Sequence, residues 1–344
     1  MLLIYGAYGY TGELVARRAA AQGVAVVLAG RNEQPLERLG AKCNAPYRVF
    51  GIDDADAIRA GIAGVRAVLN CAGPFSSTAL PLARACLQER VHYLDITGEI
   101  AVFESLAALD GEAKAAGITL LPGAGFDVVP SDCLAAHTAA RLPKAQHLTL
   151  AFTISSKASR GTATTALQNA GGGGMVRRNG KLTRVPNSFR TISVDFGRGP
   201  QRVVCIPWGD VATAFYSTGI PNIETYVALP APLRLAMHAA PLLAWKPLQR
   251  LIQNRIRKAP SGPSEEQRTQ GWSRLFAEVR TSDGQVRRSR LVAPEAYELT
   301  SWTALELASR AARGELPVGF TTPSRACGPD FILSFPGVTR EDLP

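Results

Sequence analysis

The first dozen residues constrain the fold more than any other stretch. Four apolar residues, Leu2 to Tyr5, suffice for a buried strand and are too few for a helix face. A turn with glycines at positions 6, 9 and 12 follows, and residues 13–22 are strong helix formers that end before Gly23. This order of strand, glycine turn and helix directs backbone N–H groups and the positive end of a helix dipole at a phosphate. The pattern predicts a dinucleotide-binding unit.

Each glycine of this turn has a separate expected role. Gly6 permits the tight turn out of the strand, Gly9 lets the backbone approach a pyrophosphate, and Gly12 lets the helix pack close to the sheet. The spacing G-x-x-G-x-x-G is not the commoner G-x-G-x-x-G, so the prediction depends on the flanking strand and helix. A glycine turn without a ligand is the alternative. The cofactor-binding residues expected here are Gly6, Ala7, Tyr8, Gly9, Tyr10, Thr11 and Gly12.

The end of the second predicted strand, residues 25–29, bears on the choice of dinucleotide. Sites selective for NAD usually place Asp or Glu at this tip, whereas an arginine accommodates the 2′-phosphate of NADP. Here the tip reads Gly30-Arg31-Asn32, and Arg31 can bind a phosphate through paired N–H donors. We therefore expect NADP at Arg31 and Asn32, with NAD less favoured. A solvated surface arginine is the alternative.

Composition restricts the class of protein. A chain of 344 residues with 46% hydrophobic residues predicts about two domains with real cores. Six scattered cysteines without C-x-x-C and four histidines without ligand spacing predict neither a metal site nor disulfides, as is typical of the cytoplasm. No uncharged apolar run reaches 18 residues, and no basic segment precedes the first strand. We therefore expect a cytoplasmic protein without a transmembrane helix or a signal peptide.

The positive charge is concentrated in the second part of the chain. Residues 1–150 hold 13 Lys and Arg against 14 Asp and Glu, whereas residues 151–344 hold 25 against 14. Such a field suits an anionic small-molecule or acyl-linked substrate, or an anionic membrane surface. Nucleic acid is not an expected partner, because the chain has no reader motif. The apolar, basic-ended stretch 232–258 could contact a membrane peripherally, cover an acyl pocket, or pack inside the protein or a homodimer.

Alternating strands and helices over residues 2–121 predict a doubly wound parallel sheet. Past Pro130, expected strands at 147–155, 190–196, 202–207, 211–217 and 223–228, with a hairpin at Asp283-Gly284, predict a mostly antiparallel sheet. The fold class is therefore α/β, with a Rossmann domain over 1–129 completed by the C-terminal segment 294–344. An α+β substrate or dimerisation domain covers 130–293. We expect loops at 171–174 and 259–271 and an extended tail over 316–335; the glycine run 171–174 is alternatively a second phosphate cradle.

Ligands of such sheets gather at the carboxyl ends of the strands. Asp53 is placed to reach an adenine edge or to cap the next helix. The turn of Asn70, Ala72, Gly73, Pro74 and Phe75 is expected at the ribose and nicotinamide.

Asp127, after the sixth strand, is the first candidate for a proton relay, because an apolar turn raises the pKa of a carboxyl. It could instead cap the helix from Pro130 or fix its own turn. Tyr93 is the second candidate and could equally be a core residue. His92 and Asp132 are further candidates by position.

Several segments resemble the saccharopine dehydrogenase-like oxidoreductases, and especially the branch that contains the trans-acting enoyl reductases. They are 6–12, Ala29-Gly-Arg-Asn32, Asn70-Cys-Ala-Gly-Pro-Phe75, His92-Tyr-Leu-Asp-Ile-Thr-Gly-Glu99 and Pro122-Gly-Ala-Gly-Phe-Asp127. The resemblance implies an NAD(P)-binding Rossmann domain, a second domain inserted before a C-terminal return, and hydride transfer at a C–N or C=C bond. By position it places glycines 6, 9 and 12 at the pyrophosphate and Arg31 at the 2′-phosphate. The motif around Asp127 departs from the amino-acid branch, so that branch's substrate groups are not implied.

Three functions follow from these observations. The first is an NADP-dependent oxidoreductase acting on an unidentified enoyl, imine or amino-acid-type compound. The second is a non-catalytic NADP-binding sensor or scaffold, and the third is a protein associated with a lipid surface. The tyrosine–lysine mechanism of short-chain dehydrogenases is excluded, because no tyrosine has a lysine four residues later.

Overall fold

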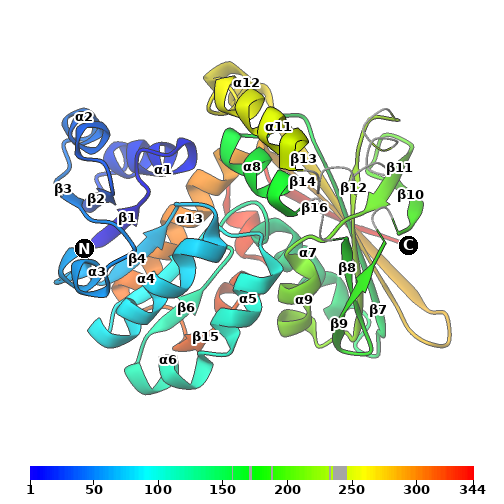
Figure 1. The fold of residues 1–344 in the computed structure, drawn as a ribbon. Helices are drawn as coiled ribbons and strands as arrows, with labels where there is room; N and C mark the ends of the chain where they lie inside the picture. Colours follow the sequence, from blue (N-terminus) through cyan, green and yellow to red (C-terminus); the bar gives the residue numbers. More distant parts are fainter. Residues whose placement is uncertain (157, 170–172, 187–188, 232–233, 235–245) are drawn as a thin grey trace. The chain divides into compact units, whose positions relative to one another are not determined.

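The computed structural model describes residues 1–156, 158–169, 173–186, 189–231, 234 and 246–344 (Figure 1). The chain divides into two compact units. Unit 1 comprises Met1–Val129 and Tyr297–Gly328, and unit 2 comprises Pro130–Ala296 and Pro329–Pro344. The segment 294–344, expected to complete the first domain, is thus divided, with its middle part in unit 1 and its last sixteen residues in unit 2.

The core of unit 1 is a seven-stranded sheet in the order β15-β6-β5-β4-β1-β2-β3. All of its neighbouring strands pair in parallel. The order reverses at β1, which lies between β2 and β4, and ligands of doubly wound sheets bind at such a point. The predicted parallel Rossmann sheet is confirmed. The strands are β1 (Leu2–Tyr5), β2 (Val26–Gly30), β3 (Tyr47–Val49), β4 (Ala67–Asn70), β5 (His92–Asp95), β6 (Thr119–Leu121) and β15 (Gly319–Phe320).

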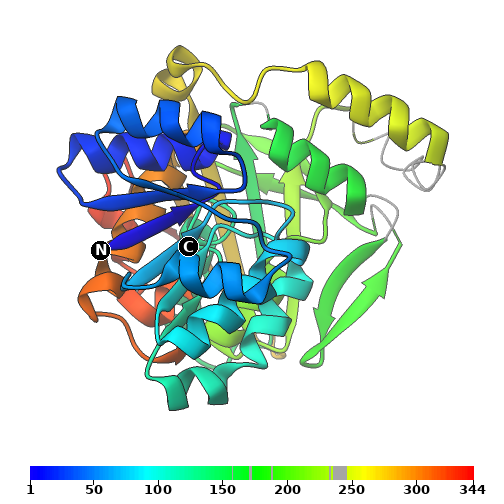
Figure 2. The same ribbon diagram turned by 60° about the vertical axis from the view of Figure 1, so that its left-hand side comes forward.

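Helices cover both faces of this sheet. Figure 2 shows α1 and α2, in blue, together on one face, and α3 packs against α4 on the other. Between β5 and β6 lie two short helices, α5 and α6, and Leu109 is the N-cap residue of α6. The helices are α1 (Tyr10–Ala21), α2 (Glu33–Cys43), α3 (Ala55–Ile62), α4 (Phe75–Glu89), α5 (Ile100–Ala107), α6 (Asp110–Ala116), α13 (Ala296–Arg313) and α14 (Pro323–Cys327).

The long helix α13 returns the chain to unit 1 and packs against α1. The Nε of Arg18 donates to Ser301 Oγ at 2.8 Å, and the same guanidinium pairs with Glu298. It also lies 5.1 Å from the Trp302 ring centroid. These contacts fix the helix that follows the glycine turn.

Unit 2 contains a nine-stranded mixed sheet in the order β10-β11-β12-β7-β13-β14-β16, with β8 pairing both β12 and β9. Among the described strands, β7 and β12 pair in parallel and the other neighbours are antiparallel. The predicted mostly antiparallel sheet is confirmed. The strands are β7 (His147–Ile154), β8 (Gly174–Arg178), β9 (Lys181–Val185), β10 (Thr191–Asp195), β11 (Pro200–Cys205), β12 (Asn222–Ala228), β13 (Trp272–Arg280), β14 (Val286–Pro294) and β16 (Thr339–Leu343).

The helices of unit 2 include one that the sequence predicted as a strand. Residues 211–217 belong to a helix that ends at Gly219, whose φ of 71° makes it a left-handed cap. Short apolar runs fit both periods, and this glycine cap was the signal for a helix. The helices are α7 (Val129–Ala140), α8 (Arg160–Asn169), α9 (Asp210–Thr218), α11 (Lys246–Lys258), α12 (Glu265–Gln270) and a 3₁₀ helix (Phe331–Ser334).

Three expected loops also contain regular structure. Ser264 forms a capping box with Gln267 and so starts α12 within 259–271. The tail over 316–335 holds β15, α14 and the 3₁₀ helix. Of the glycine run, Gly171 and Gly172 lie outside the described residues, whereas Gly174 begins a hairpin that turns at Asn179 and Gly180, both with positive φ.

Candidate functional site

The glycine turn after β1 is packed so closely that side chains would not fit at Gly6 and Gly12. Gly6 has a φ of +75°, and a Cβ there would lie 2.8 Å from Ala72. A Cβ on Gly12 would lie 2.3 Å from the carbonyl oxygen of Gly6, so only glycine lets α1 approach the strand this closely. Gly9 precedes the first residue of α1, and its N–H donates to Gly6 O at 2.9 Å. The turn therefore brings the N-terminus of α1 to the carboxyl end of β1.

The N-terminus of α1 has no side-chain cap, because its N-cap residue is Gly9. The N-terminus of α3 differs, since Asp54 accepts hydrogen bonds there from the N–H groups of Asp56 and Ala57. The N-terminus of α4 is also occupied by a carboxylate, that of Glu99. Of these three helices, α1 alone presents its positive end without a protein carboxylate on its cap, which suits an anionic ligand.

Two charged residues, Arg31 and Asp53, follow β2 and β3 at the carboxyl edge of the sheet. A Cβ on Gly30 would lie 2.6 Å from Tyr8 Cε1, so the Tyr8 ring covers the end of β2. Arg31 and Asp53 are both exposed. Burial raises the pKa of the nearby Tyr5 to about 12; the charge of Asp53 adds to this rise and the charge of Arg31 opposes it. The helix cap considered for Asp53 is supplied by its neighbour Asp54. Asn32, also exposed, is the N-cap residue of α2 and makes no side-chain cap bond.

The turn after β4 is held by the buried side chain of Asn70. Its Nδ2 donates to Thr78 Oγ1 at 2.9 Å and to the Tyr93 hydroxyl at 3.2 Å, and its Oδ1 accepts from Ala72 N at 3.0 Å. Both amide hydrogens of Asn70 are thereby used inside the protein. Asn70 shapes the turn, and the remaining predicted residues are left at its surface. Ala72, Pro74 and Phe75 are half-buried, Gly73 is exposed, and the Gly73–Pro74 peptide is cis.

The Tyr93 hydroxyl, considered as a proton relay, is enclosed in the core. It donates to Asp95 Oδ2 at 2.9 Å, and burial raises its pKa well above the usual value. Tyr93 is fully buried, and among the described residues its hydroxyl hydrogen-bonds to Asn70 and Asp95. The geometry therefore favours the core position over contact with a substrate.

Asp95 is a central polar residue that the sequence analysis did not select. Its Oδ1 accepts hydrogen bonds from Thr97 N and Gly123 N, each at 3.0 Å, so the carboxylate joins the turns after β5 and β6. Burial raises its pKa to about 6, although these N–H donors act in the opposite direction. Its place in the segment His92-Tyr-Leu-Asp-Ile-Thr-Gly-Glu99, which carries the family resemblance, was the available sequence signal.

Glu99 is a second residue that the sequence analysis did not select. Its two carboxylate oxygens accept from the N–H groups of Phe75 and Ser76 at 2.8 and 3.0 Å. It therefore caps the helix after the Asn70 turn from a distant part of the chain. The N-cap residue of α4 is Pro74, whose side chain cannot accept a hydrogen bond, and this is the sequence signal for such a partner.

Asp127 lies half-buried in the turn after β6, with its carboxyl group against Gly98. A Cβ built on Gly98 would lie 2.8 Å from Asp127 Oδ2. Burial raises the pKa of Asp127 to about 7. The turn is fixed from α13, because Phe126 N donates to Thr300 Oγ1 at 2.9 Å and Thr303 Oγ1 donates to Ala124 O at 2.8 Å. A carboxyl that is partly protonated at neutral pH thus lies beside the Asp95 turn.

The other sequence candidates lie elsewhere. His92 is a core residue whose Nδ1 accepts from Thr119 N at 3.0 Å, and burial lowers its pKa, so it is neutral. Asp132 is buried in unit 2, where Ser217 Oγ donates to it. In the described residues, no group of three His, Cys, Asp or Glu side chains is arranged to hold a metal ion. None of the described helices combines the length and apolar character that a bilayer span needs.

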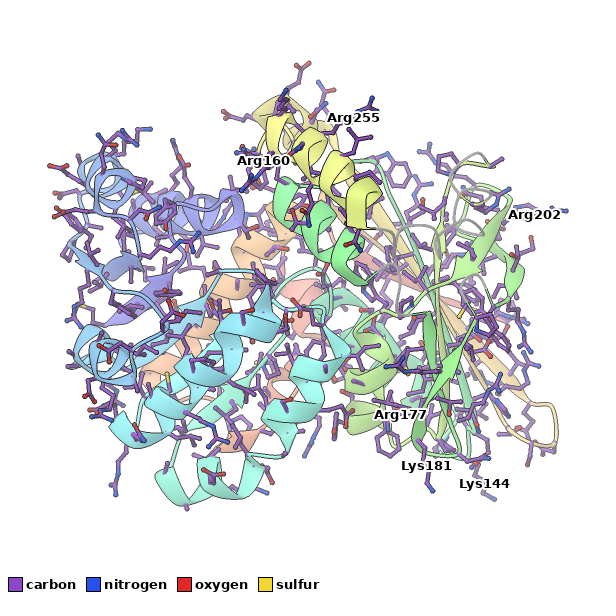
Figure 3. The ribbon with its side chains drawn as sticks, in the orientation of Figure 1. Lys144, Arg160, Arg177, Lys181, Arg202 and Arg255 are labelled. Carbon is purple, nitrogen blue, oxygen red and sulfur yellow. The ribbon has the colours of Figure 1, made fainter. Side chains whose placement is uncertain are left out.

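The basic stretch 232–258 is described in part. Residues 232–233 and 235–245 lie outside the described residues, and 246–258 form α11, which packs against α8. Figure 3 labels Arg160 on α8 and Arg255 on α11 among the basic residues of unit 2. Arg160 is exposed and its Nη1 donates to Arg257 O at 3.3 Å.

Comparison with known proteins supports the assignment of the first unit. Residues 2–121 match the family described as the saccharopine dehydrogenase NADP binding domain. The trans-acting enoyl reductases of Mycobacterium leprae and Mycobacterium tuberculosis are 32% identical over 139 residues, which are 38% of this chain and 33% of each relative. The match therefore spans about a third of the length of these relatives.

Two solved structures share the fold over nearly the whole chain. Apo saccharopine dehydrogenase (L-Glu forming) from Saccharomyces cerevisiae has a TM-score of 0.67 at 11% identity and covers 100% of this chain and 99% of its own. Homospermidine synthase from Legionella pneumophila, in complex with NAD, has a TM-score of 0.68 at 10% identity and covers 99% and 91%. At these identities the likeness concerns the fold alone. With the family match, the resemblance read from the sequence is confirmed, and residues 2–121 match the saccharopine dehydrogenase NADP-binding domain.

Proposed function

We propose that the chain is an NADP-dependent oxidoreductase. The observation that carries the proposal is the N-terminus of α1, which lies at the β1 reversal of the sheet without a side-chain cap, while Asp54 and Glu99 occupy the N-termini of α3 and α4. A diphosphate is the ligand that this arrangement favours electrostatically. The family match supports the same ligand class.

The residues around this turn would divide the binding of the dinucleotide between them. The backbone of residues 6–12 would hold the diphosphate, and Arg31 would bind the 2′-phosphate through paired N–H donors. Asn32 and Asp53 would lie along the adenosine part. Ala72, Gly73, Pro74 and Phe75 would line the ribose and nicotinamide, with Asn70 holding their turn. The choice of NADP over NAD rests on Arg31, since the NAD bound in the homospermidine synthase structure shows that this fold also accepts NAD.

Asp127 is our proposed proton donor. When bound, the nicotinamide supplies a hydride, so the protein must orient the substrate, exclude water and move one proton. Asp127 suits the last task because burial raises the pKa of its carboxyl to about 7, near the pH at which a general acid works best. Asp95 and Tyr93 would act on the site by fixing the turns that surround it.

The substrate class follows from the relatives, and we propose an enoyl or imine compound. Curated relatives of this chain are named trans-acting enoyl reductases, and one structural neighbour is a saccharopine dehydrogenase. The test is NADPH oxidation at 340 nm with α,β-unsaturated thioesters and with imines formed from amines and keto acids. Turnover with either class supports the proposal. Tight binding of NADPH without turnover of any of them would instead support a sensor or scaffold.

A second candidate, association with an anionic lipid surface, is favoured by α11. This helix contains no Asp or Glu, ends in Arg255, Arg257 and Lys258, and leaves Leu251 56% exposed. Such a helix can bury its apolar side chains at a membrane surface while its cations face lipid headgroups. Flotation with vesicles of anionic lipid, compared with neutral vesicles, tests it. Substitution of Leu251 and Arg255 by Gln should abolish flotation, and equal flotation with neutral vesicles would contradict it.

A further inference from the structure

A hollow in unit 2 is lined by an arginine that has no ionic partner among the described residues. Arg274 on β13 lies opposite Val292 on β14, which in turn lies opposite Thr339 on β16. These residues therefore share one face of the sheet. With Phe196, Arg290 and Glu341 they line a hollow with a volume of ≈ 270 Å³.

Arg274 is 9% exposed as a whole residue. Its guanidinium lies 4.5 Å from the centroid of the Trp272 ring. Within the described part of the chain, no carboxylate pairs with this guanidinium and no acceptor hydrogen-bonds to it. Burial and, to a smaller extent, the neighbouring Arg198 lower its pKa.

Arg177, another arginine of the same unit, differs from Arg274 because backbone carbonyls accept hydrogen bonds from its guanidinium. It is 4% exposed, its Nε donates to Val211 O at 2.9 Å, and its Nη1 donates to Gly180 O at 2.8 Å. It also lies 4.2 Å from the Phe215 ring centroid. Arg274 has a comparable aromatic contact without comparable acceptors. Since no described residue accepts from the N–H groups of Arg274, these donors are available to an anion that enters the hollow.

Arg290 adds a second guanidinium to the hollow. It is the diagonal neighbour of Arg274 on the adjacent strand, a separation that long side chains can bridge. Its Nε and Nη2 bind the carbonyl and the carboxylate of Asp195, at 2.8 and 3.1 Å. Its Nη1 is 3.9 Å from Glu341 Oε2, which is beyond hydrogen-bond distance. Glu341 is 68% exposed, so its carboxylate can remain in solvent when another anion binds.

We propose that this hollow binds a phosphate-class oxyanion between Arg274 and Arg290, with the Thr339 hydroxyl as a further donor. Arginine forks match the paired oxygens of phosphate and sulfate, and stacking on Trp272 leaves the N–H edge of Arg274 available. The volume is just below the 300–1,000 Å³ typical of pockets for larger ligands, which suits a small anion or the terminal phosphoryl group of a larger molecule. The site lies in unit 2 and does not depend on the function proposed for the dinucleotide-binding turn.

The direct test follows the Nε–Hε resonance of Arg274 by NMR of the full-length protein labelled with ¹⁵N-arginine. The resonance is assigned by its loss in Arg274→Lys. Inorganic phosphate should shift it in a saturable way, whereas chloride at equal ionic strength should not. An Arg274 resonance that does not respond to phosphate, or that moves equally with chloride, overturns the proposal.

Thermal unfolding provides a second test with a matched control. Arg274→Met keeps the apolar stem and removes the guanidinium, so in phosphate-free buffer, where no ion pair or hydrogen bond of Arg274 with a described residue is lost, its Tm should be close to that of the wild type. Phosphate should raise the Tm of the wild type and of Arg287→Met, an exposed change of equal charge on β14, by more than that of Arg274→Met. An equal rise in all three proteins would mean a general salt effect and contradict the site. If Arg274→Met does not fold, the NMR titration of the wild type decides alone.

Discussion

The carboxylate of Glu99 accepts a hydrogen bond from the backbone N–H of Phe75 at 2.8 Å and so caps a helix that begins 24 residues earlier in the chain. Its second oxygen accepts from Ser76 N at 3.0 Å. A negative charge of the protein therefore neutralises the positive end of α4 and holds the turn at Asn70. At the N-terminus of α1 the cap residue is Gly9, which supplies no such charge. This difference is the basis of the proposed dinucleotide site.

Removal of the Glu99 carboxylate should destabilise unit 1. In Glu99→Ala the first N–H groups of α4 lose their acceptors, which should lower the free energy of unfolding by about 1–2 kcal/mol. Glu99→Gln keeps one acceptor oxygen and should lose less. Denaturant unfolding measures the change, with Glu112→Ala at an exposed position of α6 as the control. Equal stability of Glu99→Ala and the control would show that the cap contributes nothing.

Replacement of Arg31 should change cofactor selectivity. Arg31→Ala should lower the affinity for NADPH by tenfold or more and leave the affinity for NADH almost unchanged, because only NADPH loses a charge-assisted bidentate contact. Calorimetric titration of both cofactors measures the two affinities. Arg38→Ala, an equal change of charge at an exposed position of α2, should alter neither. Equal losses for both cofactors in Arg31→Ala would remove the argument for NADP.

The pH dependence of turnover should report the carboxyl group of Asp127. A general acid must be protonated to donate, so reduction should be fast below the pKa of about 7 and should slow as the pH rises through it. Asp127→Asn should lower kcat by about 10²–10⁴-fold and abolish this limb of the profile, with NADPH affinity unchanged. A profile with the same limb in Asp127→Asn would assign the proton to another group.

The same carboxyl group should make stability depend on pH. The pKa of Asp127 is raised on folding, so the folded state holds the proton more tightly and this group's contribution falls as the pH rises from about 4 to about 7. Asp127→Asn lacks this loss and should gain stability relative to the wild type between pH 5 and pH 8. Each tenfold gain in proton affinity on folding corresponds to about 1.36 kcal/mol, and partial exposure of the carboxyl reduces the effect. Thermal unfolding at both pH values measures it, and a constant difference between the two proteins would contradict the raised pKa.

Local patterns were sufficient to predict the opening strand, turn and helix of the first unit. The strand and the glycines of residues 2–12 predict the turn because sterics at Gly6 and Gly12 leave little choice. In unit 2, residues 211–217 were predicted as a strand because a short apolar run fits the strand period as well as the helix period. The left-handed cap at Gly219 shows that they form a helix. The hairpin at Asn179–Gly180 had a turn signal that the neighbouring glycine run obscured.

Contacts between segments that are distant in the chain could not be predicted from the sequence. Asp95 bonds Gly123, and Glu99 caps α4, through pairings that only the parallel sheet brings together. The burial of Tyr93 and its hydrogen bond to Asp95 are likewise properties of the folded sheet that the sequence pattern does not contain. Arg274 belongs to the same class, because its lack of a partner among the described residues is a property of the folded sheet.

Calorimetric titration of NADPH into the folded wild-type protein tests the central claim most directly, namely that the turn between β1 and α1 binds a diphosphate. We predict saturable binding of one NADPH per chain, with weaker binding of NADH. Absence of binding of both dinucleotides to protein whose folding is verified would contradict the cofactor site and the oxidoreductase function together.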